Sequence, residues 1–257
     1  LAQKHAEVGF FPGSTQKRDF LSAVGNALLG RIINSTPLEK LKLAKLLWRQ
    51  LKQGEIMLWF NDTDLEATVK RRQWDGSLGE PANGDYLYIV ETNLGANKAN
   101  CCVTRGVTQE LEDSGTKLTI KYTNNNEFAN PKPPIFWGGN YIDYLRIVLP
   151  KSAQVKSIKV GDKQLVEKPL DNQYGLQEDR YQVEERDKLK IVGFWAVVPA
   201  QQLLTVQADY ELPVANSSAI LIKHQPGMER FLYQLTVQGK LVSSDTIDRD
   251  KEYRWTK

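Results

Sequence analysis

The hydrophobic pattern changes its period near Asp85, and this change constrains the fold more than any other feature of the sequence. Before Asp85, apolar residues recur every three or four positions, as on one face of an amphipathic helix. From Asp85 onward they alternate with polar residues, as in strands with one buried face. Many short strands separated by turn residues, without intervening helices, indicate packed antiparallel sheets. The sequence therefore predicts an α+β fold, with a helical N-terminal layer over residues 1–80 followed by an antiparallel β-sandwich over residues 81–257.

Two long helices are expected in the first part of the chain, and each carries recognisable end signals. The first begins at Ser14 or Thr15, and its apolar residues recur at helical spacing. The second begins with residues 36–39, Thr-Pro-Leu-Glu, in which the threonine and glutamate form a capping box and proline occupies the first helical position. We expect it to end at Gly54, because glycine commonly follows the last helical residue.

The remaining elements are expected to be short. Residues 55–60 are expected as a strand, and Asn61 or Asp62 as the cap of a further helix. The acidic residues from Asp245 to Glu252 are expected in a solvated tail. Strands of the β region are expected over 86–92, 101–112, 116–123, 141–149, 154–160, 181–186, 189–198, 203–211, 218–224 and 231–238.

The two cysteines, Cys101 and Cys102, are adjacent in the sequence and fall in one of these expected strands. Neighbouring side chains on a strand point to opposite faces of the sheet. We therefore expect two reduced, partly buried thiols rather than a disulfide.

Composition and motifs exclude several classes of function. The chain has 34 Lys and Arg against 31 Asp and Glu, and this near balance argues against a dedicated nucleic-acid binder. The sequence contains no nucleophile elbow, no His-Glu-x-x-His motif, no Walker loop and no dinucleotide fingerprint. Of the two histidines, His224 precedes a Gln-Pro-Gly turn, where a packing role is favoured over general-base catalysis. We predict no catalytic residue, no metal ligand and no cofactor.

Two polar loops are the candidates for binding. The loop 91–100 is rich in asparagine and glycine, which tolerate left-handed backbone and tie a loop to itself. Asn93, Asn97 and Lys98 are its candidate binding residues. Two interpretations remain open: a self-bonded connection that sets strand register, or a recognition loop in which Lys98 projects as a fixed cation. In the first interpretation Lys98 pairs inward with Glu91 or Asp85.

The second candidate loop, residues 130–141, combines stiffening prolines with paired glycines and several aromatic residues. Trp137, Tyr141 and, further along, Arg146 are its candidate binding residues. Aromatic side chains of this kind either stack on sugars and proline-rich peptides or plug the end of a sandwich. Both interpretations are retained.

Several residues share their order and spacing with a known family. They are Trp74-Asp75-Gly76, Asp85-Tyr86-Leu87, Val90, Asn93, Gly95, Asn97, Lys98, Arg105, Tyr141, Tyr144, Arg146, Pro150, Pro199, Tyr210, Pro213 and the run 223–227, Lys-His-Gln-Pro-Gly. Together they resemble a bacterial family catalogued as domain of unknown function 4012. The resemblance covers most of this chain and corresponds to the C-terminal part of the family's domain. Cys101 and Cys102 depart from the family pattern.

The resemblance implies a location rather than a chemistry. Members of the family are membrane-anchored proteins with the domain outside the cytoplasm, often in the context of surface polysaccharide production, and no catalytic residue is established for them. Because the chain begins with Leu1, we also expect it to be a soluble fragment of a longer protein.

The leading hypothesis is therefore a non-catalytic extracytoplasmic module of a bacterial cell-envelope protein that binds a surface glycan or a protein partner, with no nucleic-acid partner. Two alternatives belong to other classes: an enzyme acting on cell-wall or surface polysaccharide, and an architectural domain that positions the missing N-terminal segment.

Overall fold

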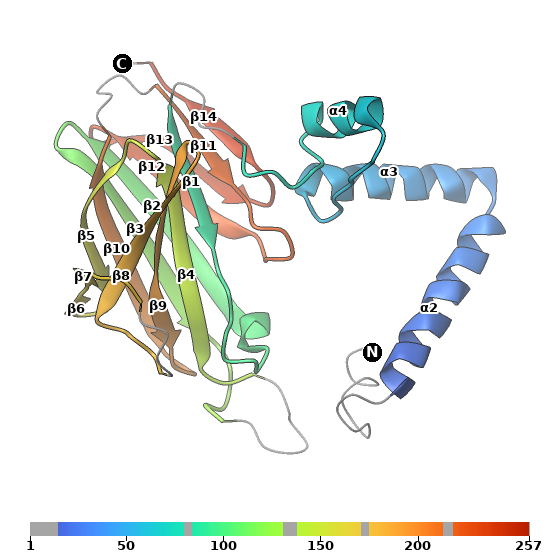
Figure 1. Cartoon of the computed structure of the whole chain (residues 1–257), viewed down its shortest axis with the longest axis horizontal. Helices are drawn as coiled ribbons and strands as arrows, with labels where there is room; N and C mark the ends of the chain where they lie inside the picture. Colours follow the sequence, from blue (N-terminus) through green and yellow to red (C-terminus); the bar gives the residue numbers. More distant parts are fainter. Residues whose placement is uncertain (1–14, 80–83, 131–137, 171–174, 213–217, 257) are drawn as a thin grey trace. The chain divides into compact units, whose positions relative to one another are not determined.

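The computed structural model of the chain (Figure 1) describes residues 15–79, 84–130, 138–170, 175–212 and 218–256. The chain divides into two compact units, Leu1–Leu51 and Lys52–Lys257. The boundary precedes the third helix, which therefore groups with the β unit, whereas the sequence grouped it with the helical region.

The first unit contains helices α2 (Thr15–Ile33) and most of α3 (Pro37–Gln53). The predicted capping box is confirmed, because Glu39 Oε2 accepts from the Thr36 backbone N–H at 2.8 Å and Thr36 Oγ1 accepts from the Glu39 N–H at 3.4 Å. Gly54 follows α3 with a positive φ of 75°, as expected of a helix C-terminus. None of the helices in the described ranges has an apolar stretch long enough to cross a membrane.

The second unit begins with a short helix, α4 (Thr63–Arg71). Its predicted cap is confirmed: Asp62 Oδ1 accepts from the backbone N–H groups of Asp64 and Leu65. The prediction of a strand over residues 55–60 is wrong, because this segment forms no β-strand. The Leu58 N–H instead donates to the Trp74 carbonyl at 2.8 Å.

Two seven-stranded sheets form the rest of this unit. The first has the order β14-β11-β1-β4-β9-β8-β7 and the second β13-β12-β2-β3-β10-β5-β6. The chain crosses repeatedly from one sheet to the other. The strands of the first sheet are β1 (Asp85–Val90), β4 (Tyr141–Pro150), β7 (Val166–Glu167), β8 (Arg180–Arg186), β9 (Leu189–Val198), β11 (Ala219–Lys223) and β14 (Lys251–Arg254). Those of the second are β2 (Val103–Glu112), β3 (Gly115–Asn124), β5 (Gln154–Val160), β6 (Lys163–Gln164), β10 (Leu203–Glu211), β12 (Phe231–Val237) and β13 (Lys240–Ile247).

The sheets face each other across a shared apolar core, as in a β-sandwich (Figure 1). Leu87, Ile147 and Val192 of the first sheet and Val107 and Ile120 of the second are buried in the same cluster. Burial of this apolar surface is the main stabilising contribution to the fold.

The α+β class is confirmed, but the sheets are not purely antiparallel, which corrects the predicted antiparallel sandwich. Three strand pairs run parallel: β1 with β11, β2 with β12, and β7 with β8. Parallel strands cannot be joined by a tight hairpin. Between β1 and β11, and between β2 and β12, the chain passes through other strands of the sandwich, whereas β7 and β8 are consecutive in the chain. The acidic C-terminal region is also not a tail, because β13 and β14 are edge strands.

The expectation of reduced thiols is wrong as well. Cys101 and Cys102 are joined by a disulfide. Strand β2 begins at Val103, and the two cysteines lie in a 3₁₀ turn, η1 (Ala99–Cys102). The strand argument for opposed side chains therefore does not apply to them.

Candidate functional site

The loop 91–100, named here the asparagine loop, is fixed by its own side chains at one end of the sandwich. Asn97 Nδ2 donates to the Asn140 carbonyl at 2.7 Å, and Asn97 Oδ1 accepts from the Ala99 N–H at 3.1 Å. The Gly138 N–H donates to the Asn97 carbonyl at 2.6 Å. The Asn93 side chain accepts from the Gly95 N–H. The two predicted loops are thus hydrogen-bonded to each other.

Two buried asparagines, Asn124 and Asn126, connect these hydrogen-bonded loops to the second sheet. Asn124 Nδ2 donates to the carbonyls of Gly139 and Val198 at 3.0 and 2.8 Å. Asn126 Nδ2 donates to the Ala99 carbonyl at 2.8 Å. Buried backbone carbonyls of both loops receive hydrogen bonds in this way. These bonds hold the loops in a single conformation.

A buried polar cluster lies beneath the asparagine loop. Arg105 Nη1 and Glu91 Oε1 form an ion pair at 2.6 Å, with side chains only 5% and 1% exposed. The hydroxyls of Tyr122 and Tyr141 donate to the same carboxylate at 3.1 and 2.7 Å. Burial, with the negative charge of Glu91, raises the pKa of Asp143 well above its ordinary value. This cluster is enclosed in the core and supports the loop from within.

An aromatic and polar strip occupies the outer face of the first sheet, beside the same loop. Along β4 and β9, alternate residues enter the core, so Tyr144, Arg146 and Trp195 lie on the opposite face. The Tyr144 and Trp195 rings meet edge to face, with centroids 5.5 Å apart. Gln182 Nε2 donates to Tyr144 Oη at 3.0 Å. Tyr144, Arg146, Trp195 and Gln182 are named here the outer strip.

Gly193 creates the space that the outer strip needs. It lies between Arg146 and Gln182 in the sheet register. A Cβ atom at this position would overlap the Tyr144 hydroxyl. The missing side chain lets the tyrosine ring lie over the strand and reach Gln182. Partial burial raises the pKa of Tyr144, so its hydroxyl stays protonated at neutral pH.

Thr92 joins the outer strip to the asparagine loop. Arg146 Nη2 donates to Thr92 Oγ1 at 2.8 Å, and the Arg146 guanidinium lies 6.0 Å from the Tyr144 ring centroid. The Thr92 carbonyl accepts from the Tyr144 N–H at 2.9 Å. The Thr92 N–H donates to Asp143 Oδ1 at 2.5 Å. The loop and the strip therefore form one continuous polar and aromatic surface.

Five of the six predicted binding residues lie in the described ranges, and four of these belong to the asparagine loop or the outer strip. Asn93 and Asn97 shape the loop, Lys98 is exposed in a left-handed backbone conformation with φ of 56°, and Arg146 belongs to the outer strip. Tyr141 is buried in the core and reaches no surface. The sixth residue, Trp137, lies outside the described residues. That any of them binds a ligand stays a prediction.

Sequence reasoning missed Trp195 and Gln182. Trp195 falls in the nearly continuous apolar run of β9, where the outward positions carry no polar marker. The sequence signal for this site is Gly193, which interrupts the apolar run of β9. A glycine on the outer face of a strand indicates that a neighbouring side chain approaches the backbone closely.

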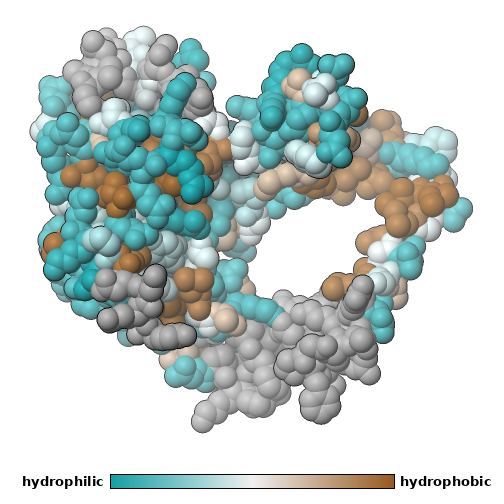
Figure 2. All heavy atoms as spheres, viewed as in Figure 1, coloured by the Kyte–Doolittle hydropathy of each residue, from teal (hydrophilic) through white to brown (hydrophobic). Residues whose placement is uncertain are grey.

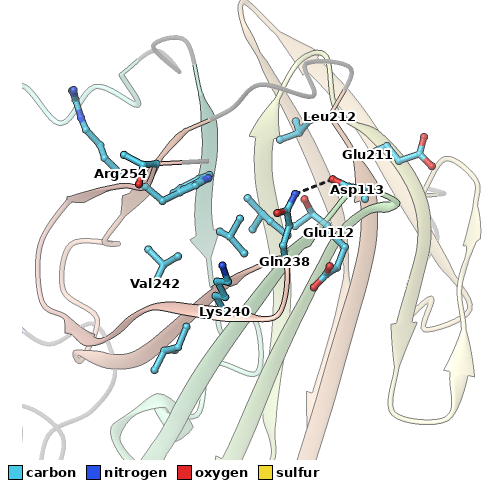
Figure 3. Close-up of a pocket in the computed structure, with 15 residues that line it drawn as sticks. Glu112, Asp113, Glu211, Leu212, Gln238, Lys240, Val242 and Arg254 are labelled. Carbon is cyan, nitrogen blue, oxygen red and sulfur yellow. Dashed lines mark hydrogen bonds between the residues drawn. The ribbon is translucent and has the colours of Figure 1, made fainter.

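A pocket of about 980 Å³ lies at the other end of the sandwich (Figure 3). The turns of the β2–β3 and β12–β13 hairpins form part of its lining. Gln238 Nε2 donates to Asp113 Oδ1 at 3.1 Å, and the Gly239 N–H donates to Glu112 Oε1 at 3.1 Å, so the hairpins tie to each other. None of the predicted binding residues in the described ranges lines it.

The carboxyl groups with raised pKa values are interior groups. Asp85 and Asp143 are each 1% exposed. Asp85 Oδ2 accepts from Gln109 Nε2 and from Tyr210 Oη at 2.9 and 3.1 Å. Neither aspartate lines the pocket of Figure 3. Within the described ranges, no group of three or more His, Cys, Asp or Glu side chains is placed to hold a metal ion.

No protein-family model matches this chain, and a search of curated proteins finds no match.

Proposed function

We propose that this chain is a non-catalytic binding module whose ligand, a surface glycan, lies across the outer strip and the asparagine loop. The observation that carries the proposal is the Tyr144–Trp195 pair on the outer face of the first sheet, flanked by Arg146 and Gln182. Aromatic rings offer apolar area to the C–H faces of sugars, while amide and guanidinium groups bond to hydroxyls or carboxylates.

Preorganisation supports this proposal. The loop is held by hydrogen bonds from Asn97, Asn124 and Asn126, and the Tyr144 hydroxyl is held by Gln182. A ligand that meets a fixed surface loses less binding free energy to ordering side chains. A protein partner on the same surface is the competing occupant, and the binding test below distinguishes the two.

The cellular setting is part of the same proposal. The resemblance to domain of unknown function 4012 favours a membrane-anchored bacterial envelope protein with this module outside the cytoplasm. The Cys101–Cys102 disulfide supports that location, because disulfides persist mainly in oxidising compartments. Protease treatment of intact cells expressing the full-length protein tests it: cleavage of the module from outside is expected, and protection until lysis would contradict it.

The packing of the N-terminal helices as a layer is also proposed. Both helices expose large apolar side chains, among them Leu21, Leu28, Leu29, Ile33, Leu38 and Leu41. Figure 2 shows hydrophobic residues in brown along the helical part of the chain. Such side chains gain free energy when another surface covers them. In the architectural alternative, that surface belongs to an N-terminal segment that the module positions, and a longer protein with that segment binds a partner while this chain does not.

The decisive experiment is calorimetric titration of the purified chain with neutral and uronic-acid-containing bacterial oligosaccharides. Binding is expected for at least one glycan class, and Trp195→Ala should weaken it by about tenfold or more. Trp59→Ala is the matched control, because Trp59 is 71% exposed and lies outside the strip. Equal loss in both variants contradicts the assignment of the site.

The same samples test the enzyme alternative. Steady release of reducing ends from any of these glycans would overturn the non-catalytic proposal. A partner protein that binds the wild type but not Trp195→Ala, without any glycan binding, would keep the surface and replace its ligand.

A further inference from the structure

The disulfide lies at the junction between the asparagine loop and strand β2. Cys101 is exposed and Cys102 is half-buried. The first residue of the same turn, Ala99, is fully buried. The bond is therefore at the surface of a turn whose other side enters the core.

Hydrogen bonds hold the core side of this turn. Asn126 Nδ2 donates to the Ala99 carbonyl at 2.8 Å, and the Asn125 N–H donates to the Cys102 carbonyl at 2.8 Å. The Cys101 N–H donates to the Lys98 carbonyl at 3.2 Å. The disulfide adds a covalent constraint within the last two residues of this turn.

Adjacency makes the constraint local and strong. Because the cysteines are neighbours, the bond closes a ring through a single peptide unit. The backbone torsions between the two Cα atoms are then restricted together. Opening the ring returns that conformational freedom to the turn, and the ordering of the loop end then costs more entropy.

We infer that Cys101 and Cys102 form a solvent-accessible redox site whose oxidised state fixes the end of the asparagine loop. The co-reactant is a dithiol, either a small molecule or a protein. One thiolate of the dithiol attacks a cysteine sulfur, and the Cys101–Cys102 bond breaks through a mixed disulfide. The second thiol of the reductant then closes its own disulfide. Two electrons and two protons pass to the cysteines, which become two thiols.

The first test is a count of thiols in the folded chain, purified without reductant. Intact mass after iodoacetamide treatment without denaturant should show no adduct. After native treatment with dithiothreitol it should show two. Two adducts before reduction, or a bond that dithiothreitol leaves intact in the folded protein, would each overturn the inference.

The second test reads the loop itself, by amide hydrogen exchange of a peptide covering residues 93–102. Reduction should raise its exchange rates by about tenfold, which corresponds to about 1.4 kcal/mol in the free energy of local opening. Peptides from β4 and β9 serve as the internal control and should not change. Equal exchange in the oxidised and reduced chains would show that the bond does not fix the loop.

The double variant Cys101→Ser, Cys102→Ser is the matched control. Its loop should exchange at the rate of the reduced wild type and should not respond to dithiothreitol. If this variant does not fold, the wild-type measurements decide alone. The thiol count and the hydrogen exchange do not depend on glycan binding. They therefore test the redox site independently of the proposed function.

Discussion

Arg105 and Glu91 form an ion pair inside the sandwich, with Nη1 and Oε1 2.6 Å apart and both side chains almost fully buried. The pair joins β2 of the second sheet to the residue that follows β1 of the first. Tyr122 and Tyr141 donate to the same carboxylate from β3 and β4. The Glu91 carboxylate, at the start of the asparagine loop, thus contacts side chains from three strands, β2, β3 and β4.

Removing the cation from this pair should be costly. We expect Arg105→Met to lower the free energy of unfolding by about 3–5 kcal/mol, because it leaves the Glu91 carboxylate buried without its countercharge. Adding Glu91→Gln should recover part of the loss, since a neutral amide oxygen still accepts from the tyrosines. Urea denaturation measures both variants. Lys156→Ala breaks an exposed pair with Glu211 and should cost less than about 1 kcal/mol. An Arg105→Met loss no larger than this control would contradict the prediction.

Asp85 should make stability depend on pH. Burial raises the pKa of Asp85 to about 7, from an ordinary value of 3.8. Between about pH 4 and pH 7 the folded chain keeps a proton that the unfolded chain has lost. The stability contributed by the neutral carboxyl is therefore complete below about pH 4, declines as the pH rises, and is lost above about pH 7. The full change is about 4 kcal/mol.

The variant Asp85→Asn isolates this contribution, because an amide resembles the protonated carboxyl in shape. The difference in unfolding free energy between Asp85→Asn and the wild type should grow in favour of the variant from pH 4 to pH 7.5. Denaturant titrations across that range measure it. Asp245→Asn is the control, since Asp245 is exposed and pairs with Lys251 at the surface. A difference that does not change with pH would show that Asp85 is ionised in the folded chain.

Local signals predicted the parts of the fold that depend on local contacts. The cap at Asp62 and the capping box at 36–39 need only neighbouring residues, and both are present. Every strand expected from alternation in the β region exists, with ends displaced by two residues at most. The edge strands β13 and β14 were missed because the acidic residues of 245–252 resemble a solvated tail. In the structure these charges pair with lysines and arginines instead, as Asp250 does with Lys223 and Glu252 with Arg254.

Another group of errors concerns contacts between residues distant in the sequence. The parallel pairing of β1 with β11 places Tyr86 beside Leu221, and nothing local to either strand indicates its partner. The same holds for the outer strip, in which Tyr144, Gln182 and Trp195 come from three strands. Alternation shows that such residues face outward, but the register decides which of them meet.

The two roles considered for the asparagine loop make different predictions for neighbouring residues. Asn97→Ala removes bonds to the Asn140 carbonyl and the Ala99 N–H, so it should lower the unfolding free energy by about 1–3 kcal/mol. Lys98→Gly should change stability between zero and a gain of about 1 kcal/mol, because glycine tolerates the left-handed backbone that Lys98 adopts. Thermal unfolding measures both.

Glycan affinity of the same variants separates the interpretations of Lys98. A loss of affinity in Lys98→Gly without a loss of stability identifies a binding cation. Unchanged affinity in Lys98→Gly, with destabilisation confined to Asn97→Ala, leaves the loop a purely structural connection.

Gly193 offers the sharpest test of the outer strip. The variant Gly193→Ala places a methyl group where the Tyr144 hydroxyl lies, so the ring must rotate away and lose its hydrogen bond from Gln182. We expect a loss of about 1–3 kcal/mol in unfolding free energy and a weakening of glycan binding by about tenfold. Near-ultraviolet circular dichroism should change as well, because Tyr144 and Trp195 are in ring contact.

Gly106→Ala is the matched control for Gly193→Ala: Gly106 also lies in a strand, but a Cβ there meets nothing within 4 Å. In the background Tyr144→Ala the cost of Gly193→Ala should largely disappear, as a double-mutant cycle requires of residues in direct contact. An equal cost in both backgrounds would show that the glycine serves the backbone of β9 and not the position of the tyrosine.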